Sequence, residues 1–458
     1  MAGWAVVSLL LLSSPGPVPA EWTYRAKVLG DGALGLEAKF PAGSATLLTL
    51  PSRARPFVQG LEIAALDRGP FRSIDLEWSA PECARGCRLR YRFPLIEATR
   101  RLAGVAGSSL FDGGLLTSTS LWLVRPEQAP LGMRYQLRFE AAAGQRFLSG
   151  LSPIDPYTYQ GPAEHLSPAP FAVLGEVSVR RFEFGDRRVE LAYPPGRFKV
   201  GDRALELWVD RALRAVTDYY GRFPVPHALV VLVPIPGHET GRATAMGFGG
   251  ASVRLEVGVD MSEAELAQVW ELVHELTHLG LANLGPDHHW IEEGLATYLE
   301  PVIRVRAGLL SRERYWRELQ AGLQNGLPTP ESRGFNGTRS WGETYWGGAL
   351  YFFLADLQIR RATHGKKSLD DALRAIVAAG LDLRVFAEVE EVLKVGDRAT
   401  GTTVLFDLYQ KVAHRPYPVD LAPIWRSLGV RSEGEVVNFD DRAKEAQIRE
   451  AMTQGRGR

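Results

Sequence analysis

The chain has 458 residues, of which 45% are apolar and 23% are charged. This is an ordinary composition for a soluble globular protein, and the length exceeds what one hydrophobic core usually holds, so we expect two or three domains. Lys plus Arg and Asp plus Glu both total 53, giving a formal net charge of zero. That balance excludes a strongly basic or acidic protein and gives no reason to expect a nucleic-acid or anionic-membrane partner.

The first twenty residues are typical of a signal peptide. Ala5–Leu12 is a short apolar run, a Pro-Gly-Pro break follows it, and the small residues Val18 and Ala20 suit cleavage before Glu21. A buried N-terminal helix is the alternative, but the break and the polar stretch after it argue against one. We therefore predict that residues 1–20 are removed and that the protein is exported to the periplasm or secreted. No later run approaches the roughly 20 apolar residues of a membrane span, so we expect no span in the mature chain.

The two cysteines, Cys83 and Cys87, lie on either side of a short Gly-containing turn. In an exported protein, such a close pair is expected to form a local disulfide. Because the loop that it closes is very small, the bond should pin a turn rather than stabilise the whole fold. A metal site here would need further ligands nearby, and the stretch offers none.

Residues 21–197 show the alternation of apolar and polar side chains that is typical of β-strands. Clear examples are the runs 87–93, 119–124 and 134–139, with Gly, Pro or Asp between such runs. We predict an antiparallel, β-sandwich-like N-terminal domain over these residues. It contains no catalytic group of residues, and the isolated His165 is expected to lie in a loop.

From residue 198 onward the pattern changes to mixed helices and strands. Ser262 and Glu265 form a predicted capping box that opens a helix, and Gly285-Pro286 is expected to end it. The other expected elements are a helix over 202–220, strands over 229–233 and 254–259, a helix from about 291, and an apolar helix over 341–361. We predict an α/β catalytic domain over 198–365 and a largely helical C-terminal region over 366–458. The fold class is therefore α+β with several domains.

An H-E-x-x-H motif lies in the middle of the helix that starts at Ser262. On a helix, His274 and His278 project from one face, one turn apart, and can bind a single zinc ion. Glu293 on the next helix can supply the third ligand. Two histidines, one glutamate and a water make an open, catalytic zinc site, whereas a structural site is closed by four protein ligands. Zinc lowers the pKa of its water, so that Glu275 can accept a proton and pass it to the leaving amine.

Other choices of third ligand fit the sequence less well. The metzincin pattern needs a glycine and a histidine at positions 281 and 284, where this chain has Leu281 and Leu284. His288 and His289 lie in the link between the two helices and are expected at the rim of the cleft. Glu300, two turns after the third ligand, is a candidate for orienting a zinc-bound histidine, as is Thr297, with a surface ion pair as the alternative for Glu300.

With these residues the sequence resembles the gluzincin zinc metallopeptidases, in particular the glycyl aminopeptidase and aminopeptidase-N families and the peptidase-MA-like group. The resemblance rests on three segments: 274–278, the W-x-x-E-G-x-A segment at 290–296, and Tyr345-Trp346-Gly347-Gly348-Ala349-Leu350. It covers residues 200–380 well and the β-rich front more loosely. It implies a thermolysin-like catalytic domain, a Zn2+ cofactor and a peptide or protein substrate. It also places Tyr345 on the tyrosine that stabilises the tetrahedral intermediate, beside Glu275 as the general base.

Two departures from the family pattern bear on the substrate. Only the fourteen residues 279–292 separate the second histidine from Glu293, fewer than in the aminopeptidases. The loop Gly247–Ser252 contains no acid, although it corresponds to the family's loop whose glutamate binds the substrate's amino terminus. The glycines there would still let a peptide backbone lie against a strand edge. Aminopeptidase and endopeptidase action therefore both stay open.

Two further hypotheses compete with a peptidase. The first is a non-catalytic, zinc-stabilised binding or scaffold module of the cell envelope, which has no need of the base Glu275 or of Tyr345. The second is a zinc hydrolase that acts on a non-peptide amide. The sequence favours a zinc-dependent metallopeptidase over the first hypothesis and does not separate it from the second.

Overall fold

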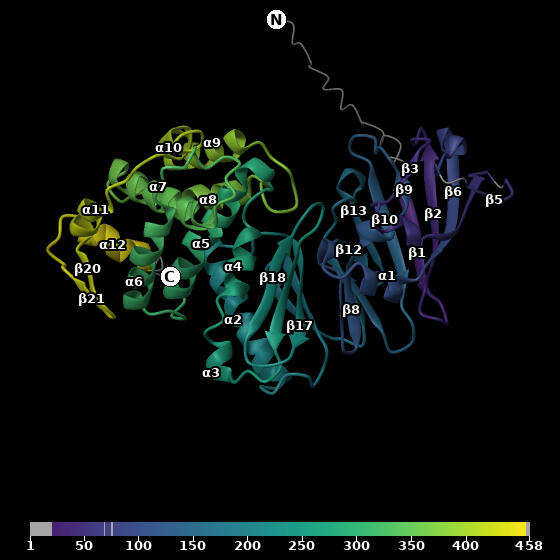
Figure 1. Cartoon of the computed structure of the whole chain (residues 1–458), viewed down its shortest axis with the longest axis horizontal. Helices are drawn as coiled ribbons and strands as arrows, with labels where there is room; N and C mark the ends of the chain where they lie inside the picture. The colour runs from purple at the N-terminus through teal and green to yellow at the C-terminus, as the bar shows by residue number, and fades with distance from the viewer. Residues whose placement is uncertain (1–20, 68, 75–76, 455–458) are drawn as a thin grey trace, which may run out of the picture.

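A computed structural model describes residues 21–67, 69–74 and 77–454 (Figure 1). The predicted signal peptide, residues 1–20, lies outside the described residues. A strand-rich N-terminal part, a central part with a mixed sheet, and a mainly helical C-terminal part follow one another along the chain, which confirms the α+β multidomain fold. Among the described residues no helix is both long and apolar enough to cross a membrane.

The N-terminal part contains two large sheets and a short two-stranded sheet of β3 (Leu48–Thr49) and β9 (Arg125–Pro126). The larger has eight strands, in the order β12 (Ser152–Asp155), β13 (Thr158–Pro162), β10 (Arg134–Glu140), β1 (Trp22–Val28), β2 (Leu34–Ala42), β6 (Arg85–Phe93), β4 (Gln59–Ala65), β5 (Arg72–Ser73). The smaller has four, in the order β11 (Arg146–Ser149), β14 (Phe171–Gly175), β8 (Gly114–Ser118), β7 (Ser109–Phe111). The helix α1 (Leu95–Arg101) follows β6.

These sheets share a core of buried aromatic and aliphatic residues, including Trp22, Trp122 and Leu174. The pairing is antiparallel as predicted except between β1 and β10, which run parallel, with Trp22 opposite Tyr135. Alternation of apolar and polar residues shows which side of a strand is buried but carries no information on strand direction, which is why the prediction was wrong for this pair. The disulfide predicted between the two cysteines is present.

The central sheet has five strands, in the order β15 (Ser178–Phe184), β16 (Arg187–Tyr193), β17 (His227–Ile235), β19 (Ser252–Gly258), β18 (Thr240–Met246). Strand β16 pairs in parallel with β17. The expected domain boundary at 197/198 therefore falls inside one sheet, and the hairpin β15–β16 belongs with the strands that follow it. A strand pattern by itself does not say which sheet the strand joins.

Both faces of the central sheet are covered. The helices α2 (Asp202–Tyr220) and α4 (Glu271–His278) contribute to the core on one face. On the other face, Leu229 and Val231 of β17 pack against Phe171 and Val173 of β14. Burial on both sides explains why β17 is a continuous apolar run. Strand β18 forms the outer edge of the sheet and, within the described part of the chain, pairs only with β19.

The helices beyond the sheet hold the rest of the candidate site and the C-terminal region. They are α3 (Glu263–Leu266), α5 (His289–Arg306), α6 (Arg312–Leu323), the π-helix η8 (Gly342–Gly347), α7 (Gly348–Ala362), α8 (Leu369–Ala378), α9 (Val389–Thr400), α10 (Val404–Val412), α11 (Leu421–Leu428) and α12 (Ala446–Thr453). The C-terminal region also contains a hairpin of β20 (Val430–Glu433) and β21 (Val436–Phe439), which the sequence did not predict.

The helix expected from Ser262 to Gly285 is divided. The capping box of Ser262 and Glu265 is present, but it opens the short helix α3, and the helix carrying the motif starts only at Glu271. In the intervening turn, the Arg304 guanidinium donates to the carbonyl of Gln268 at 3.5 Å, and the Glu271 carboxylate accepts from the backbone N–H of Trp270 at 3.0 Å. These hydrogen bonds provide partners for backbone groups of the turn in place of those that a continuous helix would provide.

Candidate functional site

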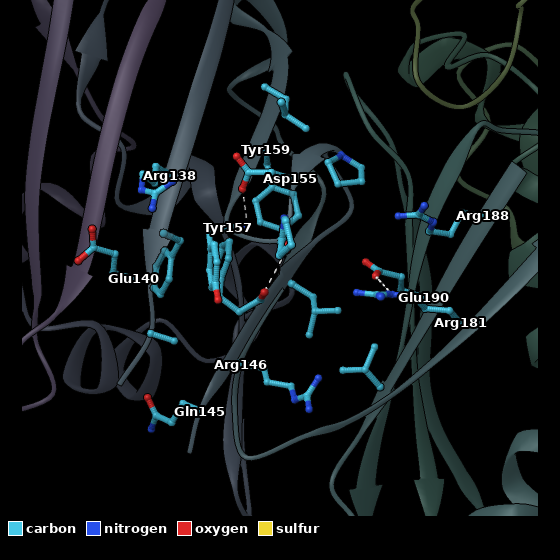
Figure 2. A pocket seen from close by; sticks show the side chains of 18 residues that line it. Arg138, Glu140, Gln145, Arg146, Asp155, Tyr157, Tyr159, Arg181, Arg188 and Glu190 are labelled. Atoms are coloured by element: carbon cyan, nitrogen blue, oxygen red, sulfur yellow. Dashed lines mark hydrogen bonds and ion pairs between the residues drawn. The ribbon is translucent and has the colours of Figure 1, made fainter. Parts of the chain in front are cut away.

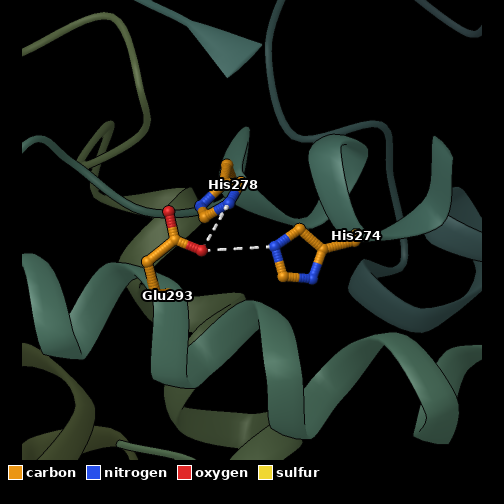
Figure 3. Close-up of side chains that lie close together, drawn as sticks. All are labelled: His274, His278 and Glu293. Atoms are coloured by element: carbon orange, nitrogen blue, oxygen red, sulfur yellow. Dashed lines mark hydrogen bonds and ion pairs between the residues drawn. The ribbon is translucent and has the colours of Figure 1, made fainter. Parts of the chain in front are cut away.

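Helix α4 carries three residues of the candidate site. His274 and His278 lie one turn apart on it, with ring centroids 5.1 Å from each other. The apolar residues Leu272, Val273 and Leu276 on other sides of the helix are buried in the central core. The helix is thus fixed by its apolar faces, which orients the two imidazoles toward α5 (Figure 3).

Helix α5 brings Glu293 opposite these histidines. Gly294, the next residue, lies where α5 crosses the start of α7, and a Cβ at this position would lie 2.3 Å from the Cα of Gly348. The crossing therefore requires glycine on both helices. Because Glu293 and Tyr345 flank this contact, the close approach of the helices also sets how near their side chains come to each other.

The three side chains converge on one point. The Nε2 atom of His274 lies 3.3 Å from Oε2 of Glu293, and Nε2 of His278 lies 3.8 Å from the same oxygen (Figure 3). One ligand atom from each residue lies within 4.8 Å of both others. Ligands about 2.0–2.1 Å from a tetrahedral zinc ion are roughly 3.4 Å apart, so both the spacing and the donor types fit zinc.

Burial and mutual charges shift the pKa of each residue in the cluster. Burial lowers the pKa of His278 to about 4, so its ring is neutral and has a free lone pair near pH 7. Burial by itself would raise the pKa of Glu293, but the hydrogen bond with His274 and the two imidazoles lower it to about 2. Burial likewise acts to lower the pKa of His274, and the neighbouring carboxylates overcome it and raise that pKa.

Glu275 lies between the central sheet and the histidines. Its side chain is only 8% exposed. Burial raises its pKa to about 7, partly opposed by His274 and by a hydrogen bond from the backbone N–H of Ala245. Ala245 belongs to the edge strand β18, so the candidate base lies directly beside a strand edge that can accept a peptide. No strand was predicted at β18, because Thr240–Met246 lacks an apolar alternation.

Tyr345 reaches the site from the π-helix η8. The buried Glu343 anchors this segment by accepting hydrogen bonds from Ser332 and Thr338. The Tyr345 side chain is half-buried, and burial together with the charges of Glu293 and Glu275 raises its pKa to about 12. A phenol that stays protonated near two site carboxylates can donate a hydrogen bond there. A π-helix within a longer helix often occurs at a functional site.

The remaining candidates have other partners. Glu300 is buried rather than on the surface and forms an ion pair with Arg304 at 2.9 Å. The Nδ1 atom of His274 is buried without a hydrogen-bond partner among the described residues. His288 hydrogen-bonds Tyr409 at 3.0 Å and does not belong to the cluster. His289 is exposed at the rim of the site, and its Nε2 atom lies 3.6 Å from Oε1 of Glu293, the oxygen that does not contact His274.

The glycine-rich loop between β18 and β19 is shaped by its neighbours. A Cβ on Gly247 would lie 1.8 Å from the carbonyl oxygen of Leu383, and one on Gly249 would lie 2.6 Å from Pro162. Gly249 also donates its N–H to the carbonyl of Arg384 at 2.8 Å. The glycines therefore allow the N-terminal part and the C-terminal region to meet at this loop. This packing gives a reason for the glycines that does not involve a substrate.

A charged cleft lies elsewhere, between the N-terminal part and the central sheet. Its volume is about 870 Å³, and its walls carry Arg138, Arg146, Arg181 and Arg188 (Figure 2). The Arg181 guanidinium donates to the carboxylate of Glu190 at 2.9 Å, so part of this charge is already paired. No residue of the predicted site lines this cleft, and the two features are separate.

Comparisons with known proteins identify the fold. No protein-family model matches the sequence, and no curated protein sequence matches it either. An aminopeptidase N family protein from Idiomarina loihiensis is similar in structure, with a TM-score of 0.65, 11% identity, and coverage of 89% of this chain and 78% of that chain. An M1 zinc metallopeptidase mutant from Deinococcus radiodurans, bound to a Tyr-Ser-Ala substrate, gives a TM-score of 0.54, 16% identity, and coverage of 87% and 94%. The chain therefore has the fold of the M1 zinc metallopeptidases, with a candidate His-His-Glu metal site in the matching H-E-x-x-H…E order.

Proposed function

We propose that the protein is a zinc-dependent metallopeptidase in which His274, His278 and Glu293 hold the metal. The observation that carries this proposal is the convergence of these three side chains on one point, next to Glu275 and the free edge of β18. The M1-like fold supports it, because structures of that fold include one bound to a short peptide. The substrate we propose is a peptide or protein.

The residues around the cluster have separate roles in this proposal. The outer edge of β18 binds the substrate backbone as an added strand, which holds the scissile bond close to α4. When bound, zinc would lower the pKa of a water and polarise the substrate carbonyl. Glu275 accepts the proton of the attacking water and delivers it to the leaving amine. Tyr345 donates a hydrogen bond to the negative charge that develops on the carbonyl oxygen.

A non-catalytic, zinc-stabilised binding or scaffold module is the alternative. It would use the same three ligands but would not need a buried carboxylate beside an open strand edge. Burying Glu275 has a free-energy cost that a binding module would have no reason to retain. We therefore favour the peptidase. An assay of zinc binding together with peptide cleavage distinguishes the two functions.

Purified protein supplied with zinc is expected to bind one zinc ion per chain and to cleave a broad peptide mixture. Chelation should stop cleavage and added zinc should restore it. The reason is that the metal would have only three protein ligands, which leaves one coordination position open. Zinc content is measured by atomic spectroscopy and cleavage sites by mass spectrometry.

The variant His278→Ala is expected to lose zinc, whereas His165→Ala, which alters a histidine outside the cluster, should keep it. A protein that binds zinc but cuts no peptide would support the scaffold module instead. Internal cuts would indicate an endopeptidase, and stepwise loss of N-terminal residues would indicate an aminopeptidase.

We also propose that the protein is exported. The N-terminal sequence pattern supports this, and the Cys83–Cys87 disulfide fits an oxidising compartment. Sequencing the amino terminus of the mature protein tests the proposal: a start at Glu21 is expected, and a retained Met1 in the cell interior would contradict it.

A further inference from the structure

Two tryptophans differ from all others in the described part of the chain. Ten of the eleven tryptophans lie in that part, and eight of these are buried or half-buried. Only Trp270 and Trp341 are exposed, at 45% and 62%. Large exposed aromatic side chains are costly to solvate and are enriched where a protein binds a partner.

Both exposed tryptophans lie one helical turn before a ring of the candidate site. Trp270 precedes His274 by four residues, and their ring centroids are 5.4 Å apart in an edge-to-face arrangement. Trp341 precedes Tyr345 by four residues, with centroids 5.9 Å apart and planes tilted by 31°. The only two exposed indoles among the described tryptophans therefore both border the site, although they come from helices far apart in the sequence.

The surroundings of the indoles indicate which side chains they receive. An indole face can bind aromatic and aliphatic groups, and also cations, which bind best with a carboxylate close by. Glu293 is the proposed metal ligand, and the carboxylates next in sequence to the indoles already accept hydrogen bonds within the fold. Glu271 accepts hydrogen bonds from the Thr240 hydroxyl at 2.5 Å and from the backbone N–H of Trp270 at 3.0 Å. Glu343 accepts from two hydroxyl groups and is only 7% exposed.

We propose that Trp270 and Trp341 form the specificity-determining surface of the site and select peptides with aromatic or large aliphatic side chains near the scissile bond. This inference rests on the proposed peptidase function and adds a substrate class to it. The indoles bind the substrate side chains by stacking and by burying apolar area, while the edge of β18 binds the backbone irrespective of sequence.

The test starts from the cleavage sites that the native protein makes in a broad peptide mixture. Phe, Tyr, Trp and Leu are expected to be enriched beside the scissile bond. Three synthetic peptides with Phe, Ala or Lys at the enriched position then give KM and kcat. Trp270→Ala and Trp341→Ala should each raise KM for the Phe peptide about five- to tenfold, with little change for the Ala peptide.

The matched control is Trp208→Ala, which removes a half-buried indole on α2 that lines a different cavity and should leave all three peptides unchanged. Trp270→Phe keeps an aromatic ring and should restore most of the affinity. That rescue separates substrate binding from damage to α4. Equal KM changes for the Phe and Ala peptides, or a preference for Lys, would overturn the proposal.

Binding measurements keep this test separate from that of the peptidase function. If zinc-loaded native protein cuts nothing, the peptidase function fails. Calorimetry with the uncut Phe and Ala peptides then decides about the indoles. Tighter binding of the Phe peptide that Trp270→Ala or Trp341→Ala removes would still support the aromatic surface. Equal binding of both peptides, or none, would overturn it.

Discussion

Glu275→Gln is expected to slow peptide hydrolysis by about 10³- to 10⁴-fold while leaving zinc binding intact. The amide of glutamine has nearly the shape of the carboxylate but cannot accept a proton from the attacking water. The ligands His274, His278 and Glu293 are unchanged, so the metal content should match that of the native protein. The measurement is kcat/KM on one cleaved peptide, together with zinc per chain.

Two variants give a graded comparison with this result. Glu271→Gln changes another glutamate of α4, whose carboxylate is engaged by Thr240, and should lose far less activity than Glu275→Gln. Tyr345→Phe removes a hydrogen-bond donor and should lower kcat by about 10²-fold with little effect on KM. Retention of native activity by Glu275→Gln would show that Glu275 is not the base.

Asp370→Asn is expected to lower the free energy of unfolding by about 3–5 kcal/mol, because it leaves a buried guanidinium without its counter-ion. Asp370 accepts a hydrogen bond from Arg306 of α5 at 2.8 Å and one from Tyr219 of α2 at 2.9 Å. The Asp370 and Arg306 side chains are only 6% and 9% exposed. The pair therefore holds α8 against the helix that carries Glu293. Urea unfolding followed by tryptophan fluorescence measures the change.

The contribution of this pair also depends on pH. Burial would raise the pKa of Asp370, but Arg306 overcomes it and lowers that pKa below its ordinary value. A carboxyl group whose pKa is lower in the folded state stabilises the fold above the unfolded pKa of about 3.9, and this stability is lost as the pH falls. The difference between native and variant stability should therefore be constant near pH 7 and shrink in acid.

Glu390→Ala is the matched control for Asp370→Asn, because it breaks an ion pair with Lys394 that is about half exposed. The N–O distance there is 3.1 Å, comparable with that of the buried pair. Exposed pairs of this kind contribute about 0.3–0.5 kcal/mol. Equal losses for the two variants would show that the buried pair does not stabilise the contact between the helices.

The local part of the candidate site could be predicted from the residues alone. The helical period placed His274 and His278 on one face of α4, and a charged residue before a glycine pointed to Glu293 on the next helix. The 3.6-residue repeat is a property of the backbone, so it holds wherever the helix lies in the fold. The mixed α+β class followed in the same way, from strand-like alternation in the front and helical periodicity behind it.

How these parts meet could be seen only in the folded structure. It assigned β15 and β16 to the central sheet, and it revealed β18, whose small and polar residues carry no alternation because no side chain of this strand is fully buried. It explained Gly247 and Gly249 by close contacts with distant segments. It also showed that Trp270 and Trp341 alone among the described tryptophans are exposed. Strand partners, close backbone approaches and exposure depend on residues far apart in the chain, and no local period encodes them.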